Sequence, residues 1–462
     1  MPLQFFDGKQ KMSLRILIVA LVSVTLAGAA VVASAQALAD SRQSQGKPLW
    51  LIGGRADPPP GPEATYAEMV VLVAASSEGL EETSGTTTSG DASTTEPLLR
   101  YSGPIVIAKG GRYSGNWESL NPSVPVVQIN TTEPVTVENC RMRGRGNLIS
   151  ALRDSTSVII RNCIGESLNP NVLNGKKGRF AMFWKPINVL IENNTLLSTA
   201  GIYVNNGNNP TKTVRVRYNI AKNIDGRISD GKGGYLIEDY FAQFVQLNSV
   251  KGSPDVEISW NEVINEPGIS RVADNINIFL SSGTSSRPIL IHDNFVRGAY
   301  PMDPASSRFS GGGIIVDGGT SVIADAAGHI RIYDNQVVGT SNHGISIAAG
   351  HHVEIVRNRL VSSGLLPDGT RVGAANVGLY AWNYYKNADA MFENTIRENS
   401  VGWVNSKGSM NNWWFPDCAA PNCSDNRIIR GPITISMEDD EYILWRRKIS
   451  ENGVKLGSSL LP

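Results

Sequence analysis

The chain has 462 residues and a mass of 49.8 kDa, which fits one large repetitive domain with appendages. It has 42 Lys plus Arg and 42 Asp plus Glu, so its formal net charge is zero. We therefore expect no nucleic-acid partner, because such proteins need a basic excess to pair with phosphates. Hydrophobic residues make up 41% and charged residues 18%, which argues against disorder and for a cored protein rich in turns.

The N-terminus is typical of an export signal. Basic residues precede an apolar run at 16–32, and two small-residue cleavage sites follow at 33–35 and 37–39. We assign residues 1–39 to a signal peptide, with an uncleaved membrane anchor as the alternative. We expect an exported monomer, periplasmic or extracellular, with no stable membrane span after cleavage.

Residues 40–100 are predicted to form a flexible segment. They contain three consecutive prolines at 58–60 and a Thr/Ser/Gly run at 83–90, which bury too little apolar surface to offset the entropy of ordering. Asn is absent before Asn116 and abundant afterwards. We place the main domain at 101–402 and a C-terminal segment at 403–462.

The main domain repeats a phrase: a β-branched residue, two polar or aromatic residues, Asn, one residue, and then Val, Ile or Leu. The Asn slot of this phrase is occupied by Cys140, Cys163, Asn194, Asn219, Asn261, Asn294, Asn335, Asn358 and Asn399. The intervals between slots run from 23 to 42 residues, which is a solenoid period with loops of varying length.

A second series of short strands interleaves with the first. It includes the segments 202–204, 245–247, 276–278, 314–316, 345–347 and 379–381, each lying between two successive slots. The residues alternate with period two, so each strand has one buried face. Two strand series in step, with no helical periodicity between them, predict stacked coils and an all-β fold.

The Asn slot has a physical explanation in such a stack. Equivalent turns lie about 4.8 Å apart, so the amide of one Asn can donate to the side-chain oxygen of the next and form a ladder. Asn also tolerates the left-handed conformation that a sharp turn needs. The alternative is that Asn only marks turns.

This pattern resembles the right-handed parallel β-helix superfamily, which includes pectate lyases, polygalacturonases, alginate epimerases and phage tailspikes. The resemblance covers roughly 104–401 and implies a right-handed solenoid. It is weak for function, because this fold hosts many activities.

The four cysteines form two candidate pairs. Cys140 and Cys163 occupy adjacent slots, and the coil spacing falls within the Cα separation that a disulfide accepts. Cys418 and Cys423 flank a short loop, and export would favour both disulfides. The alternative for the first pair is two stacked free thiols. No Cys–His spacing typical of zinc sites is present, so we expect no zinc site and assign no metal ligands.

Aromatic residues cluster after the repeat, including Trp403, Trp413, Trp414 and Trp445. A β-helix must cover its open end or associate through edge strands, so we interpret 403–462 as a cap. The alternative is that Trp413 and Trp414 stack on sugar rings.

The residues between the buried positions of the second series should face outward, and they include amides, aromatics and one carboxylate. The candidate substrate-binding residues on this face and in its loops are Tyr203, Asn205, Gln246, Asn248, Asn277, Arg308, Tyr380 and Trp382. Amides and aromatic rings suit a long hydroxyl-rich ligand. The alternative is a purely structural outer face.

Charged loops enter the same strands. The candidate catalytic residues there are Asp317, His343, Arg271, Tyr240 and Lys232. The stretch at 342–347 is similar to a Gly-His-Gly-Ile-Ser-Ile phrase of polygalacturonases. The other phrases of that family, of the main pectate lyases and of alginate epimerases are missing, so His343 could be only a turn residue.

We expect a protein that acts on an acidic polysaccharide, with β-elimination as the leading mechanism. His343, Tyr240 or Lys232 would remove the proton next to a uronate carboxylate, which Arg271 or Arg308 would neutralise. Asp317 is a candidate to orient the base or to hold Ca²⁺. The alternatives are the related C5 epimerisation, a hydrolase with Asp317 and a second carboxyl, and a non-catalytic polysaccharide-binding or cell-surface protein.

Overall fold

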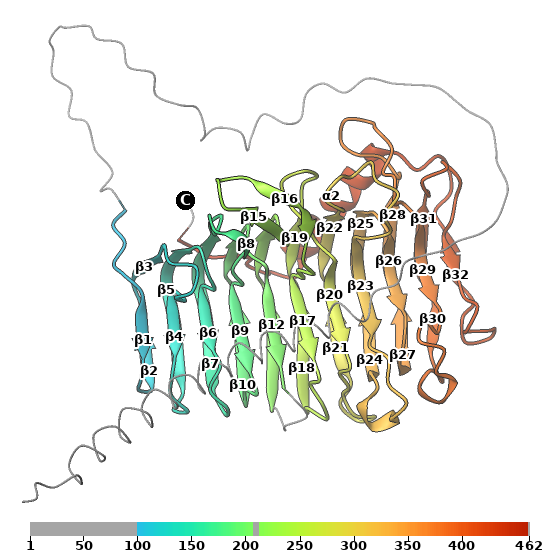
Figure 1. The fold of residues 1–462 in the computed structure, drawn as a ribbon. Helices are drawn as coiled ribbons and strands as arrows, with labels where there is room; N and C mark the ends of the chain where they lie inside the picture. Colours follow the sequence, from blue (N-terminus) through green and yellow to red (C-terminus); the bar gives the residue numbers. More distant parts are fainter. Residues whose placement is uncertain (1–98, 207–211, 461–462) are drawn as a thin grey trace, which may run out of the picture.

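The computed structural model describes residues 99–206 and 212–460. The signal peptide and nearly all of the flexible segment predicted for 1–100 lie outside the described residues. In Figure 1 the strands stand side by side in chain order from β1 to β32, so each coil contacts the coils before and after it.

One long parallel sheet runs the length of the stack, and we call it the long sheet. Its strands are β1 (Ile105–Ile107), β4 (Val127–Ile129), β6 (Ile149–Ala151), β9 (Ala181–Trp184), β12 (Ile202–Asn205), β17 (Val245–Asn248), β20 (Asp274–Phe279), β23 (Gly312–Asp317), β26 (His343–Ile347), β29 (Val377–Ala381) and β32 (Trp413–Trp414). This sheet is the second strand series of the sequence.

The first strand series forms two further rows of parallel strands, joined by the long strands β5 (Val135–Gly144) and β7 (Ser157–Ser167). One row has β2 (Gly111–Tyr113), β10 (Asn188–Glu192), β13 (Thr213–Arg217), β18 (Asp255–Ser259), β21 (Ile289–His292), β24 (Gly328–Tyr333), β27 (His351–Val356) and β30 (Thr395–Arg397). The other has β3 (Asn116–Ser119), β11 (Thr195–Leu197), β14 (Ile220–Lys222), β19 (Glu262–Ile264), β22 (Phe295–Ala299), β25 (Gln336–Thr340), β28 (Arg359–Ser362), β31 (Ser400–Trp403) and β33 (Arg427–Ile428). Single-turn 3₁₀ helices occupy Ile323–Asp325 and Ala388–Ala390.

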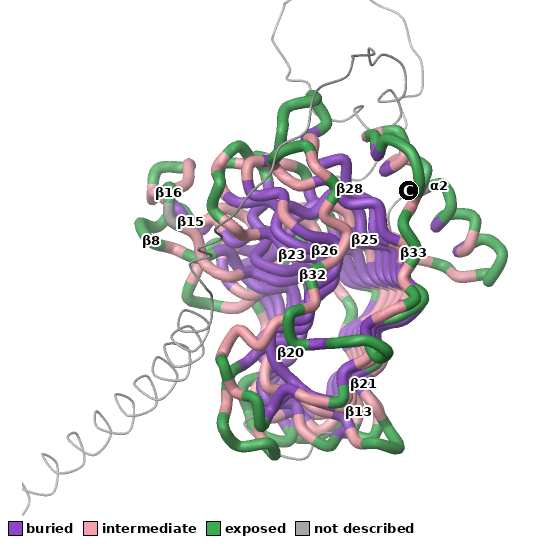
Figure 2. The backbone as a smooth tube through the Cα atoms, turned by 90° about the vertical axis from the view of Figure 1, so that its right-hand side faces the viewer, coloured by how far each residue is buried: buried purple, intermediate pink, exposed green. Residues whose placement is uncertain are grey.

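The core lies inside the stack, as the end-on view in Figure 2 shows. Val and Ile side chains from each coil fill it, and the positions predicted to point inward, such as Ile202, Val245 and Ile314, are fully buried. Parallel pairing in register repeats these side chains at the same place in successive coils. The predicted all-β solenoid is therefore confirmed at the level of parallel stacked strands.

The predicted asparagine ladder is present. From Asn194 to Asn399, each ladder side chain donates its amide to the side-chain oxygen of the next at 2.9–3.0 Å. The ladder extends one position further than the sequence repeat suggested, to Asn426.

The expected reason for Asn at the turn was wrong in one respect. The residue with the left-handed backbone is the one before each ladder Asn, for example Trp260 with a φ of 53° and Asp293 with a φ of 52°. These residues adopt a strained conformation because the ladder and the flanking strands on both sides hold the turn. The ladder Asn is thus required for its hydrogen bonds and not for its backbone freedom.

Both predicted disulfides are present. Cys140 and Cys163 pair directly across β5 and β7 with a Cα–Cα separation of 4.6 Å. The Cys163 amide then donates to the oxygen of Asn194 at 3.0 Å, so this disulfide continues the ladder toward the N-terminus. Cys418 and Cys423 close a short loop between β32 and β33.

The C-terminal segment runs back along the side of the stack. Helix α2 (Ile435–Glu451) is capped by Thr434, whose side chain accepts from the Met437 amide, and it buries Trp445 against Phe295. The following residues reach the first coils: the Ser458 amide donates to Thr195 Oγ1 at 3.1 Å, and its hydroxyl donates to Asn162. We call residues 432–460 the C-terminal strap. The expected end cap therefore corresponds to β32, β33 and their loops, while the strap covers a side.

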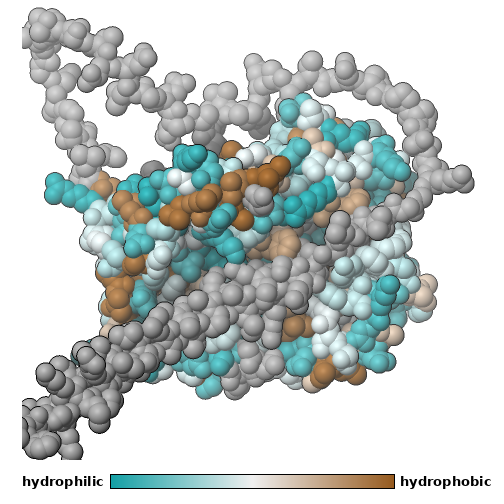
Figure 3. All heavy atoms as spheres, in the orientation of Figure 1, coloured by the Kyte–Doolittle hydropathy of each residue, from teal (hydrophilic) through white to brown (hydrophobic). Residues whose placement is uncertain are grey.

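A small antiparallel sheet projects from the stack, as Figure 2 shows. It consists of β8 (Leu173–Lys176), β15 (Arg227–Asp230) and β16 (Tyr235–Asp239). Its outer side is apolar, with Leu173 and Ile237 well exposed, and hydrophobic residues gather over these strands in Figure 3.

Candidate functional site

The outward residues of the long sheet form rows along the stack, as the sequence predicted. Tyr203 pairs with Gln246, Gln246 with Asn277, and the row continues through Ile315 and Ser346 to Tyr380. A second row joins Asn205, Asn248, Phe279 and Asp317. The register predicted for this face is therefore correct.

Several of these polar groups bind one another. The amides of Asn205 and Asn248 donate to the Tyr203 hydroxyl at 3.0 and 3.1 Å, and the Arg179 guanidinium lies 4.7 Å from the Tyr203 ring centre. These side chains are buried. Their neighbours fix their orientation, and the whole row from Tyr203 to Tyr380 is buried, so the exposed binding face expected from the sequence is not exposed in this structure.

A basic cluster lies where the projecting sheet meets the long sheet, and it has two parts. In the first, Asp225 accepts two hydrogen bonds from Arg227 at 2.9 Å and lies 3.9 Å from the Lys177 ammonium. All three side chains are largely buried. Burial lowers the pKa of Lys177 to about 8, although Asp225 partly opposes the shift.

In the second part, Asp239 accepts a hydrogen bond from Arg271 Nε at 2.5 Å and lies 3.8 Å from Arg308. The two parts adjoin because Asp225 and Arg271 form a β-bridge and Arg227 pairs with Asp239 in the projecting sheet. We define the basic cluster as Lys177, Asp225, Arg227, Asp239, Arg271 and Arg308. Four cations face two carboxylates, so the cluster has a positive net charge.

Arg271 is the most informative member of the basic cluster. Its side chain is fully buried, and among the described residues its two terminal nitrogens, Nη1 and Nη2, have no hydrogen-bond partner. Leaving a buried charged donor unpaired is costly. Two parallel donors on a planar guanidinium match the two oxygens of a carboxylate, so the arrangement fits an anionic ligand.

A His–Asp pair begins three residues after Arg271, where Asp274 opens β20. His343 Nε2 lies 3.7 Å from Asp274 Oδ1, and Asn277 donates toward the other Asp274 oxygen at 3.4 Å. The pair spans an intervening coil, because Gly312 lies between Asp274 and His343 in the register. A Cβ at Gly312 would lie 2.3 Å from His343 Nε2 and 2.6 Å from Asp274 Oδ1, so only glycine leaves room for this contact. The Tyr380 ring stands edge-on to His343 at 5.4 Å.

Asp317 lies at the other end of the long sheet's strands. Its Oδ1 accepts from the Tyr385 hydroxyl and from the Gly318 amide, both at 2.8 Å. Gly312 pairs with His343 and Asp317 follows five residues later, so the two positions are about 16 Å apart at the usual strand rise. The residue that contacts and can orient His343 is therefore Asp274, a partner that sequence reasoning did not select.

The remaining predicted residues are spread over the same region. The Tyr240 hydroxyl donates to the Lys177 carbonyl at 2.6 Å, which commits its proton to a structural bond. Lys232 is exposed in the turn between β15 and β16, at the tip of the projecting sheet. Trp382 packs near Trp414, with ring centres 5.4 Å apart, and supplies an aromatic surface near the last coils. Lys177 and Asp225 were missed, because nothing in their local sequence marks them as a pair.

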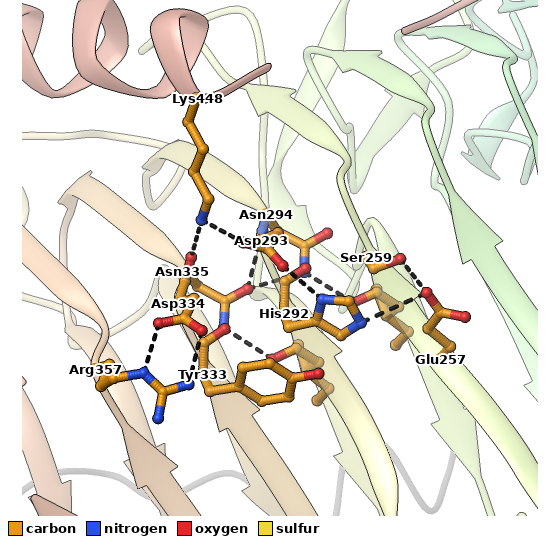
Figure 4. A network of polar contacts seen from close by, with 12 residues as sticks. Glu257, Ser259, His292, Asp293, Asn294, Tyr333, Asp334, Asn335, Arg357 and Lys448 are labelled. Atoms are coloured by element: carbon orange, nitrogen blue, oxygen red, sulfur yellow. Dashed lines mark hydrogen bonds and ion pairs between the residues drawn. The ribbon is translucent and has the colours of Figure 1, made fainter. Parts of the chain in front are cut away.

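A second polar network lies on the row of strands that contains β18, β21 and β24, as Figure 4 shows. His292 sits between Asp293, at 2.7 Å, and Glu257, at 3.5 Å, and stacks on Tyr333 with ring centres 4.7 Å apart. Burial lowers the pKa of His292, but hydrogen bonds to Asp293 and Glu257 outweigh this effect and raise it to about 9. Lys448 of α2 binds Asp293 in this network. We therefore interpret the network as a docking site for the C-terminal strap.

A cavity of about 390 Å³ lies between α2 and the neighbouring strands, lined in part by Glu262, Arg297 and Glu438. Burial raises the pKa of Glu438, and its carboxylate accepts from the Ser363 amide at 2.6 Å and from the Ser363 hydroxyl at 2.7 Å. These bonds hold α2 on the stack, so the cavity is a weaker candidate than the basic cluster.

Comparison with known proteins leaves the site to be interpreted from its own geometry. No protein-family model matches the chain, and neither a curated protein nor a solved structure matches it. Within the described residues, none of the helices is both long enough and apolar enough to cross a bilayer.

Proposed function

We propose that this protein is an exported β-helix protein that binds an acidic polysaccharide and cleaves it by β-elimination. The observation that carries the proposal is the pair of buried Arg271 nitrogens without a partner, set in a cluster of net positive charge. A uronate carboxylate supplies the two acceptor oxygens that these donors lack. The finer assignment to the right-handed β-helix superfamily belongs to the same proposal and rests on the ladder and the parallel register.

The residues can be given roles that suit this chemistry. Arg271 would neutralise the uronate carboxylate, with Arg308 at the solvent-exposed edge, and so acidify the proton on C5. His343, oriented by Asp274, would remove that proton. The electron pair then forms the C4–C5 double bond, the C4–O bond breaks, and the departing sugar oxygen takes up a proton. Epimerisation begins with the same step but returns a proton to C5.

The long sheet suits a polymeric substrate. Its amide and aromatic rows run along the stack past the proposed reaction centre, from Tyr203 on one side to Tyr380 on the other. Because the row residues are buried, contact between successive coils and successive sugar units requires this face to open. A hydrolase built on Asp317 and Asp274 is less well supported, because Asp274 pairs with Gly312 and the separation of about 16 Å exceeds that of paired glycosidase carboxyls.

A screen of uronic-acid polysaccharides with two readouts tests the proposal. We expect a new ultraviolet absorbance from an unsaturated uronate together with new reducing ends. Reducing ends without that absorbance would indicate hydrolysis, deuterium uptake at C5 without chain cleavage would indicate epimerisation, and binding without a product would indicate a non-catalytic protein.

Two variants assign the roles. Arg271→Gln should reduce kcat/KM by about 100-fold or more, because it removes the charge opposite the uronate carboxylate. His343→Gln should abolish turnover while retaining polysaccharide binding. Arg153→Gln changes an exposed arginine in the turn before β7 and serves as the matched control. Unchanged binding and turnover in Arg271→Gln would contradict the proposed function.

A further inference from the structure

Three histidines meet where β24 and β27 begin, at the turn that follows the long sheet and away from the basic cluster. The chain has five histidines, and His329, His351 and His352 bring one ring nitrogen each to within 4.8 Å of one another. The approach follows from register: Gly328 at the start of β24 pairs with His351 at the start of β27. His329 and His352 are thus equivalent positions of successive coils, and both have a left-handed backbone, with φ of 50° and 52°.

Two of the three rings have polar partners outside the cluster. His352 Nε2 lies 2.7 Å from the Glu393 carboxylate, and the His351 ring has a hydrogen bond to the backbone of Ile323. The inner nitrogens converge, because His351 Nδ1 and His352 Nδ1 are only 2.8 Å apart. Imidazole with a carboxylate or carbonyl on the outer nitrogen and its inner nitrogen directed at a common point is the arrangement found around protein metal ions.

The three histidines disfavour one another's protonation. Burial lowers the pKa of His351 to about 4, with the neighbouring His352, His329 and Lys251 acting in the same direction. Burial and His352 likewise lower the pKa of His329. Glu393, and Asp325 through its interaction with Lys251, are the acidic groups nearby. Both Nδ1 atoms of His351 and His352 can bind one ion only after the proton of the hydrogen bond between them is released, so binding should weaken as the pH falls.

The rings are held in place by the fold. His351 stacks on Phe392 with ring centres 5.0 Å apart and an interplanar angle of 7°, and on its other side a Cβ at Gly328 would come within 2.5 Å of the ring. The His329 and His352 rings lie 4.6 Å apart. Ligand nitrogens around a tetrahedral ion are about 3.3 Å apart at metal–nitrogen distances near 2.0 Å, so small side-chain rotations are enough to admit one.

We infer that His329, His351 and His352 form a binding site for one divalent transition-metal ion of the zinc class, with Glu393 supporting His352 from the outside. Three imidazoles select zinc, cobalt, nickel or copper over calcium and magnesium, which prefer oxygen ligands. Three protein ligands leave a fourth position for water or another small ligand. This site is independent of the proposed lyase activity, since it shares no residue with the basic cluster or with His343.

Titration of the untagged, chelator-treated protein with Co²⁺ and then with Zn²⁺ tests the site. We expect a single Co²⁺ per chain with visible absorption bands typical of a four-coordinate ion, displacement by Zn²⁺, and a higher melting temperature with Zn²⁺ bound. Calorimetric titration with Ca²⁺ should show no binding that these three histidines influence.

Variants locate the ion. His351→Gln and His352→Gln should each weaken Zn²⁺ binding by 100-fold or more, and Glu393→Gln by about 10- to 100-fold. His352 is half-exposed, so its variant is informative even if the buried His351 variant folds poorly. His292→Gln removes a histidine outside the cluster and should leave Zn²⁺ affinity unchanged. Failure of the intact protein to bind one Co²⁺ or Zn²⁺, or equal loss in His292→Gln and His352→Gln, would overturn the inference.

Discussion

Replacing Asn294 by alanine tests the asparagine ladder near its centre. Asn294 is fully buried, its amide donates to Asn335 Oδ1 and to the Ile258 carbonyl at 2.9 Å, and its oxygen accepts from the Asn261 backbone amide at 3.1 Å. Alanine leaves the Asn261 amide without its ladder acceptor, which costs about 1–3 kcal/mol, and the lost donor to Ile258 adds about 1 kcal/mol. The expected loss of unfolding free energy is therefore about 2–4 kcal/mol.

Thermal unfolding followed by far-ultraviolet circular dichroism measures this loss. An unfolding entropy of about 2.1 cal/mol/K per residue over about 350 ordered residues converts 2–4 kcal/mol into a fall in Tm of about 3–6 °C. Asn188→Ala is the control, since Asn188 lies outside the ladder and its amide donates to the Ser157 hydroxyl at the edge of the core. If the Tm of Asn294→Ala falls no further than that of Asn188→Ala, the ladder does not stabilise the fold as argued.

Three further predictions concern the site, the strap and the disulfides. Gly312→Ala should separate His343 from Asp274 and lower turnover at least 10-fold, while Gly103→Ala, where a Cβ meets open space, should have no effect on the rate. The ion pairs of His292 should stabilise the fold below about pH 6.5 and lose this contribution as the pH rises toward 9, since its folded pKa is raised to about 9; His292→Gln should flatten the melting temperature over that range. Mass spectrometry of unreduced protein should find a peptide linking Cys140 to Cys163, and alkylation of both thiols without prior reduction would exclude that bond.

The repeat made the fold predictable in unusual detail. Because every coil occupies the same frame, aligning the Asn slots also aligns the strands, and the predicted rows of outward residues match the observed pairing from Tyr203 to Tyr380. The same frame placed Cys140 beside Cys163. The left-handed residue lies one position before the predicted one. The sequence pattern shows where Asn recurs, but it does not show whether the turn needs the backbone conformation of Asn or its side-chain hydrogen bonds.

The candidate site was less predictable, since it depends on loops whose conformation the sequence repeat does not determine. His343 could be selected from its own phrase, but its contact with Asp274 crosses a coil and depends on the missing side chain of Gly312. The pairing of Lys177 with Asp225 depends on how the projecting sheet folds back, which the repeat does not describe. The histidine cluster was missed because its residues come from two coils, and only the register of β24 with β27 brings them together.

The C-terminal strap changes how this solenoid can assemble. In a simple stack each coil needs only its neighbours, so the first coils could fold and the last could fray independently. Here the carbonyl of Leu460 accepts a hydrogen bond from Arg141, and the Ser458 hydroxyl donates to Asn162, across sequence separations of 319 and 296 residues. The first coils are therefore expected to reach their final stability only after the last residues have been synthesised, and the two ends of the stack to melt together instead of one after the other. A chain shortened by a few residues at its C-terminus would keep all of its coils and still lose the coupling between them.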